Sequence, residues 1–134
     1  MLTDPEERAR YEESQAGVSE TEALLAAQAE QLFQRGEMLI RAGNFRGAAQ
    51  FLERAVQIYG SEPAYHAAYA WALHRQNPPD NARALTHFEQ ALAADGEDAQ
   101  ALLRMSIVVK ELGDEARATQ LASRARAIDA GVRA

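Results

Sequence analysis

The sequence predicts an all-α protein, a right-handed α-α superhelix (solenoid) of three helix-turn-helix repeats preceded by an N-terminal helix. Small side chains recur in three series, and these are Gly36, Ala70, Ser106; Ala48, Ala84, Ala118; and Ala55, Ala91, Ala125. The steps are 34 or 36 residues long, and an insertion of two residues near 77–80 explains the difference in all three series. Such a period, with small residues where helices touch, is typical of stacked helical hairpins.

The N-terminal segment predicts two helices. Residues 3–6, Thr-Asp-Pro-Glu, are a start signal, because a capping side chain precedes a proline in the first turn. We expect this helix to run to about Ala16 and to end at Gly17-Val18. Residues 19–22, Ser-Glu-Thr-Glu, form a capping-box pattern and predict a new helix from about 21 to 42. Residues 1–18 are therefore predicted to form a separate N-terminal helix, and residues 19–134 the repeat domain.

The rest of the chain predicts five more helices, each bounded by turn residues. Gly43 and Gly113 can take the left-handed conformation that ends a helix. Pro78 and Pro79 cannot lie inside a helix, and Asp80 can cap the next one. No stretch shows the two-residue alternation of a strand. The predicted helices cover about residues 45–59, 61–76, 80–94, 99–112 and 115–130.

Composition limits the function classes. The chain has 134 residues with no cysteine, which excludes disulfides and thiol chemistry, and no apolar run long enough to cross a membrane. Its net charge of −6 disfavours nucleic-acid binding. We expect a cytoplasmic protein without membrane insertion. Residues 1–28 have net charge −5 and residues 99–134 net charge +2. The basic end is either a solvated helix face or a surface for an acidic partner, including the acidic end of another copy.

With this period and these small residues, the chain resembles the tetratricopeptide repeat (TPR) family. The copies are expected over about residues 29–62, 63–98 and 99–132. The chain departs from the family where a large aromatic residue is usual early in the first helix, since it has Leu32, His66 and Leu102 there. The resemblance implies a protein-protein interaction module that binds a peptide or a helix of another protein.

A second resemblance lies at the start. Residues 2–11, Leu-Thr-Asp-Pro-Glu-Glu-Arg-Ala-Arg-Tyr, are similar to the end of a J-domain. The His-Pro-Asp tripeptide of that co-chaperone family is missing, because none of His66, His74 and His87 precedes a proline. The segment is either the remnant of a J-domain in a longer protein or an ordinary capped helix.

The TPR resemblance implies a concave groove lined by the first helix of each repeat. We expect an apolar centre with Trp71 as the anchor and basic groups at the rim. The alternatives are that the segment before residue 29 covers this surface, or that a homodimer partner does. The expected groove residues are Phe33, Glu37, Ile40, Arg41, Trp71, His74, Arg75, Leu103, Arg104, Ile107 and Lys110.

One function of the family is disfavoured by the side chains at the matching positions. Relatives that capture the acidic ends of heat-shock chaperones use a clamp of basic and amide side chains for two carboxylates. The matching positions in this chain are Phe33, Glu37, Ala68, Gln100 and Arg104, of which only Arg104 fits. Because Glu37 would repel a carboxylate, the resemblance does not extend to that clamp.

The sequence predicts no enzyme, cofactor or metal site. It has neither a glycine-rich phosphate loop nor a Gly-x-Ser-x-Gly elbow. His66 and His74 are eight residues apart, too far to share a metal without a ligand at Ala70 between them.

Three functional hypotheses follow. The first is an adaptor or client-binding part of a larger bacterial protein, including a J-domain co-chaperone. The second is a free-standing chaperone resembling those of type III secretion. The third is a structural oligomerisation module. For the groove, we expect Trp71→Ala to weaken partner capture and to leave the fold largely intact.

Overall fold

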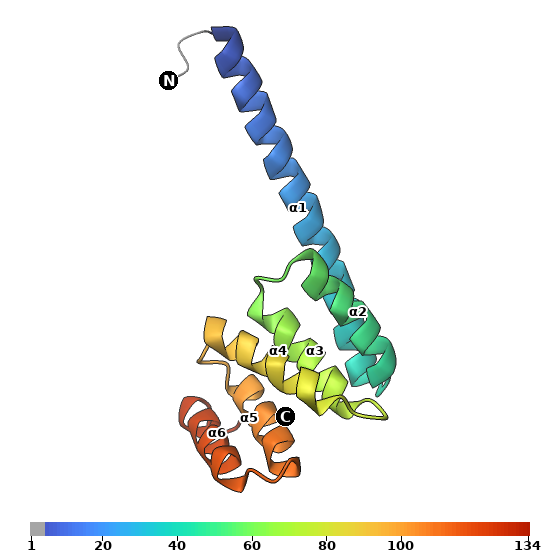
Figure 1. Ribbon diagram of the computed structural model, residues 1–134, viewed down its shortest axis with the longest axis vertical. Coiled ribbons are helices and arrows are strands. Elements are labelled where there is room, and N and C mark those ends of the chain that lie inside the picture. Colours follow the sequence, from blue (N-terminus) through green and yellow to red (C-terminus); the bar gives the residue numbers. More distant parts are fainter. Residues whose placement is uncertain (1–4) are drawn as a thin grey trace.

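The computed structural model describes the backbone of residues 5–134 and the side chains of residues 19–134. Within this part there are six helices and no strand, and the helices stack as antiparallel pairs (Figure 1). The all-α solenoid fold is therefore confirmed. The helices are α1 (Pro5–Arg41), α2 (Phe45–Ile58), α3 (Pro63–Arg75), α4 (Asn81–Ala94), α5 (Ala99–Glu111) and α6 (Glu115–Ile128).

The predicted break at Gly17-Val18 is wrong, because α1 runs without interruption over 37 residues. A single glycine costs a helix only about 1 kcal/mol, and no proline accompanies it. The expected capping residues 3 and 4 and part of the J-domain-like segment lie outside the described residues. Figure 1 shows the first half of α1 pointing away from the other helices. The alternative in which this segment covers the concave face is therefore also wrong.

The other five helices begin and end within two residues of their predicted bounds. Each starts at a side chain that accepts a hydrogen bond from a backbone N–H of the first turn. Gly43 has φ of 80° and Gly113 of 95°, so both adopt the left-handed conformation predicted for these turns. The capping residues are Asn44, Glu62, Asp80, Asp98 and Asp114.

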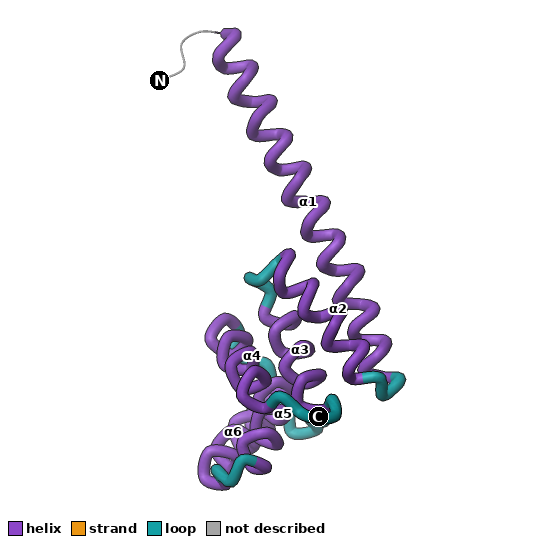
Figure 2. The backbone as a smooth tube through the Cα atoms, turned by 45° about the vertical axis from the view of Figure 1, so that its right-hand side comes forward, coloured by secondary structure: helices purple, strands orange, loops and turns teal. Residues whose placement is uncertain are grey.

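The small residues of all three series are buried, as predicted. They allow close packing within the pairs α1–α2, α3–α4 and α5–α6. Successive pairs stack because α3 packs on both α1 and α2, and α5 packs on both α3 and α4 (Figure 2). One continuous core runs through the stack, and Leu52, Phe88 and Leu102 are fully buried in it.

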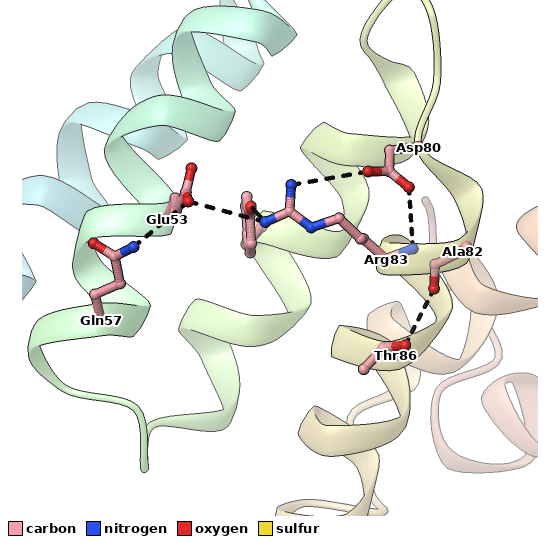
Figure 3. Close-up of polar contacts among 7 residues, drawn as sticks. Glu53, Gln57, Asp80, Ala82, Arg83 and Thr86 are labelled. Atoms are coloured by element: carbon pink, nitrogen blue, oxygen red, sulfur yellow. Dashed lines mark hydrogen bonds and ion pairs between the residues drawn. The ribbon is translucent and has the colours of Figure 1, made fainter.

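A polar link connects α2, α3 and α4 at Arg83. Its guanidinium donates a hydrogen bond to the Tyr69 hydroxyl and lies 3.9 Å from the Glu53 carboxylate and 3.8 Å from that of Asp80. Figure 3 shows the Arg83 side chain between these two acids. Burial raises the pKa of Tyr69, and the Arg83 charge opposes that rise.

None of the described helices is long and apolar enough to cross a membrane.

Candidate functional site

A small hollow lies where the three first helices of the pairs, α1, α3 and α5, come together. Its volume is about 90 Å³ and it is open to solvent. Alanines form much of its wall, and charged groups enter from α1 and from the start of α5. We call it the inner hollow. Its lining residues are Phe33, Glu37, Ala64, Ala67, Ala68, Asp98, Gln100, Ala101 and Arg104.

Arg104 is the cation of the inner hollow. Its guanidinium carbon lies 4.9 Å from the centre of the Trp71 ring. Among the described side chains, its Nε is a buried polar atom without a hydrogen-bond partner. Burial lowers the pKa of Arg104, while the Glu37 and Asp98 carboxylates counteract this effect. The hollow therefore combines a partly buried guanidinium with two carboxylates.

Trp71 does not present an exposed face. The residue is 6 % exposed and lies in the core. The guanidinium of Arg104 covers its ring, and that of Arg75 does so at 5.5 Å while also stacking 4.8 Å from the centre of Phe45. The predicted apolar centre is therefore capped by two cations, since guanidinium groups stack well on aromatic faces.

His74 is also turned inward. It is 7 % exposed, and its Nδ1 lies 2.8 Å from the Asn81 Oδ1, an acceptor, so Nδ1 donates. The other nitrogen, Nε2, lies 3.6 Å from the Glu111 carboxylate. His74 therefore joins α3 to α4 and α5.

Leu103, Ile107 and Lys110 line a different, larger hollow, between α5 and α6 at the last helix pair. Its volume is about 540 Å³. We call it the terminal hollow. Its remaining lining residues are Ser106, Glu115, Ala118, Thr119, Ala122, Ser123 and Arg126.

Ile40 and Arg41, like Trp71, His74 and Arg75, line neither hollow. Ile40 is partly buried and packs against the core, and Arg41 is exposed at the end of α1. The structure thus divides the predicted groove. Phe33, Glu37 and Arg104 meet in the inner hollow, with Trp71 and Arg75 beside Arg104.

Two polar pairs near these surfaces were missed by sequence reasoning. The Tyr65 hydroxyl donates to the Glu30 carboxylate at 2.9 Å, which fixes the ring that packs on Phe33. His66 and His87 bring their Nδ1 atoms within 2.9 Å. The repeat period shows which positions are equivalent, but it carries no signal for which side chains of neighbouring helices form hydrogen bonds.

The residues given for the chaperone clamp, Phe33, Glu37, Ala68, Gln100 and Arg104, all line the inner hollow. The five matching positions therefore converge in the structure, but their side chains are not the basic and amide groups of a clamp for two carboxylates. Asp98, the capping residue of α5, adds a second carboxylate that sequence reasoning did not consider. The one sequence feature that could have revealed Asp98 is its position immediately before α5, the first helix of the third pair.

Among the comparisons with known proteins, the one with solved structures bears on the fold. No protein-family model matches the sequence, and no curated protein does. Among solved structures, the second TPR domain of Spaghetti (RPAP3), bound to the HSP90 peptide SRMEEVD, is similar with a TM-score of 0.74. It is 21% identical, and the match covers 82% of this chain and 99% of that one.

Two further structures extend the likeness. The TPR domain of Arabidopsis OM64 has a TM-score of 0.75 at 17% identity, covering 81% of this chain and 88% of that one. MamA has a TM-score of 0.70 at 17% identity, covering 98% and 78%. At these identities the likeness establishes a TPR-type fold.

Proposed function

We propose that this chain is a protein-interaction module that binds a peptide or helix of another protein at the inner hollow. The observation that carries the proposal is the half-buried Arg104, whose Nε has no partner among the described groups and which stands where α1, α3 and α5 meet. A buried donor without a partner costs free energy, and a shift of the Arg104 side chain that brings Nε to a ligand acceptor would recover it. Peptide recognition by RPAP3, a solved neighbour of the same fold, supports the proposal.

The charges of the inner hollow indicate the kind of ligand. Glu37 and Asp98 outnumber Arg104, so the hollow has a formal charge of −1. A peptide ending in several carboxylates would meet two like charges, which is unfavourable at short range. Ala64, Ala67 and Ala68 leave room for one modest apolar side chain. We therefore propose a ligand with a small apolar group, a carbonyl that accepts from Arg104, and neutral or basic neighbours.

We further propose that the module serves as the adaptor or client-binding part of a larger protein. The likeness of residues 2–11 to the end of a J-domain supports this role.

Binding can be tested with peptides selected from a random display library on the wild-type chain. Trp71 is the only tryptophan, and its fluorescence reports on Arg104 and Arg75, which cover it. We expect selected peptides to change that emission on titration. Ala64→Arg places a long side chain at the exposed rim of the hollow and should abolish binding, with the melting temperature unchanged.

The matched control is Gln50→Arg, an equal charge change at an exposed position of α2 away from the hollow. Glu37→Lys should shift the selected peptides towards acidic sequences. Binding that survives Ala64→Arg, or a wild-type preference for acidic peptides, would contradict the proposal.

A further inference from the structure

The first half of α1 projects from the molecule as a single helix (Figures 1 and 2). Residues 5–28 would extend about 36 Å at 1.5 Å per residue. They carry six acidic residues and two arginines. Leu24 is 66 % exposed and Leu25 is 41 % exposed. In proteins most helical stability comes from the packing of an apolar face, and only the last residues of this segment lie beside the end of α2.

The terminal hollow has apolar walls and an excess of positive charge, in contrast to the acidic first half of α1. Ser106, Ala118 and Ala122 make it open, and Leu103 and Ile107 give it apolar walls. Lys110 and Arg126 stand on its lining. Within the described residues, no acidic side chain forms an ion pair with either of these cations. The segment 99–134 around it has a net charge of +2.

In each earlier helix pair, the face that corresponds to the terminal hollow packs against a helix of the next pair. The pair α1–α2 receives α3, and the pair α3–α4 receives α5. The positions of α4 that match two lining residues of the terminal hollow are Phe88, which is fully buried, and Leu92, which is partly buried. One period of 34 residues later, Ala122 and Arg126 take these places. The exchange leaves the hollow uncovered, and its lining, with Lys110 and Arg126 against Glu115, has a formal charge of +1, which suits an acidic helix better than an apolar one.

We propose that the projecting acidic half of α1 from a second copy of this chain docks in the terminal hollow. Leu24 and Leu25 would pack against the Leu103 and Ile107 wall, and Glu20 and Glu22 would lie near Lys110 and Arg126. This inference is independent of the inner hollow, because the two hollows lie on different helices and share no lining residue.

The contact joins two different surfaces of one chain, so it is heterologous. Such contacts give head-to-tail assemblies unless rotation closes them into a reciprocal dimer or a ring. Because exposed charges contribute to it, the contact weakens as salt screens them. Its apolar part persists at high salt, so association falls with added salt and does not vanish abruptly.

Light scattering coupled to size separation tests the proposal on the full chain. We expect a mass above the 14.7 kDa of the monomer that grows with protein concentration and falls in about 0.5 M salt. Lys110→Glu combined with Arg126→Glu should give a monomer. The control is Arg46→Glu with Arg133→Glu, which changes net charge equally at exposed positions outside the hollow and should leave association intact.

A charge swap identifies the occupant. Glu20→Lys with Glu22→Lys should also give a monomer, because two lysines would then face Lys110 and Arg126. Mixing this variant with the Lys110→Glu/Arg126→Glu variant restores opposite charges at both contacts, so we expect assemblies in the mixture only. A monomeric wild-type chain, including one whose hollow binds only a foreign acidic peptide, overturns the proposal. Association that is unchanged in both double variants also overturns the proposal.

Discussion

The guanidinium carbon of Arg104 lies 4.9 Å from the centre of the Trp71 ring, and that of Arg75 lies 5.5 Å from it. Two cations from different helices therefore cover one indole. Trp71 is 6 % exposed, so the ring forms part of the core and the arginines face outward. In this arrangement the indole positions Arg104, whose Nε is the group left without a partner.

Trp71→Ala should therefore destabilise the fold, contrary to the sequence-based expectation of an intact one. Removing a buried tryptophan typically costs about 3–5 kcal/mol, through lost burial and the cavity left behind. Urea unfolding followed by circular dichroism measures the change. Trp71→Phe keeps an aromatic face for the arginines and should cost less. Equal stability of the wild-type chain and Trp71→Ala would show that the ring is not packed as described.

Stability should fall as pH drops from about 6.5 to about 4, because of His87. Burial, followed by the nearby His66 and Arg83, lowers the pKa of His87 to about 4. Unfolded, the same group titrates near 6.5. Below that pH the unfolded chain binds a proton that the folded chain resists, so folding loses free energy. A shift of this size is worth about 3 kcal/mol, and we expect roughly half because the ring is only partly buried.

The hydrogen bonds around this pair fix which ring nitrogens of His66 and His87 carry a proton. His66 Nε2 lies 2.7 Å from the Gly60 carbonyl, which can only accept, so Nε2 carries a proton. In neutral His66, Nδ1 is then the acceptor for His87 Nδ1–H at 2.9 Å. A second proton on His87 would go to Nε2 and leave this bond intact, so burial of the ring is the main reason that His87 resists it. His87→Gln should flatten the pH dependence of urea unfolding between 4 and 6.5, and an unchanged slope would exclude His87 as its source.

Sequence reasoning succeeded where one steric rule repeats along the chain. Gly36 and its period mates are small because helices cross there, and that requirement is local enough to be read from spacing. It failed where the answer depends on which way a long side chain turns. Arg75 and Arg104 come from different helices, and only the fold shows that both lie over Trp71. It also failed at Gly17, because a single glycine without a proline costs a helix too little to end it.

Arg83→Ala should have a small effect, about 1 kcal/mol, although Arg83 contacts three side chains. Its side chain is 52 % exposed, and exposed ion pairs such as those with Glu53 and Asp80 contribute little. The main loss is the hydrogen bond to the Tyr69 hydroxyl, which is left without that donor. In a Tyr69→Phe background the cost of Arg83→Ala should therefore shrink, as measured by urea unfolding in a double-mutant cycle. A cost that stays the same would place the effect in the ion pairs.

Gly36→Ala should destabilise the protein although alanine favours helices. A Cβ at position 36 would lie 2.5 Å from the Leu52 Cγ, and Leu52 is fully buried. Overpacking of this kind costs about 1–3 kcal/mol, against a gain of about 1 kcal/mol in helix propensity. The net loss should reverse in a Leu52→Ala background, where the added methyl group fills space. Gly96→Ala, whose Cβ would only reach an ordinary 3.5 Å contact, is the control and should change the midpoint of urea unfolding little. A stabilising Gly36→Ala in the wild-type background would mean that α1 and α2 do not cross at this residue.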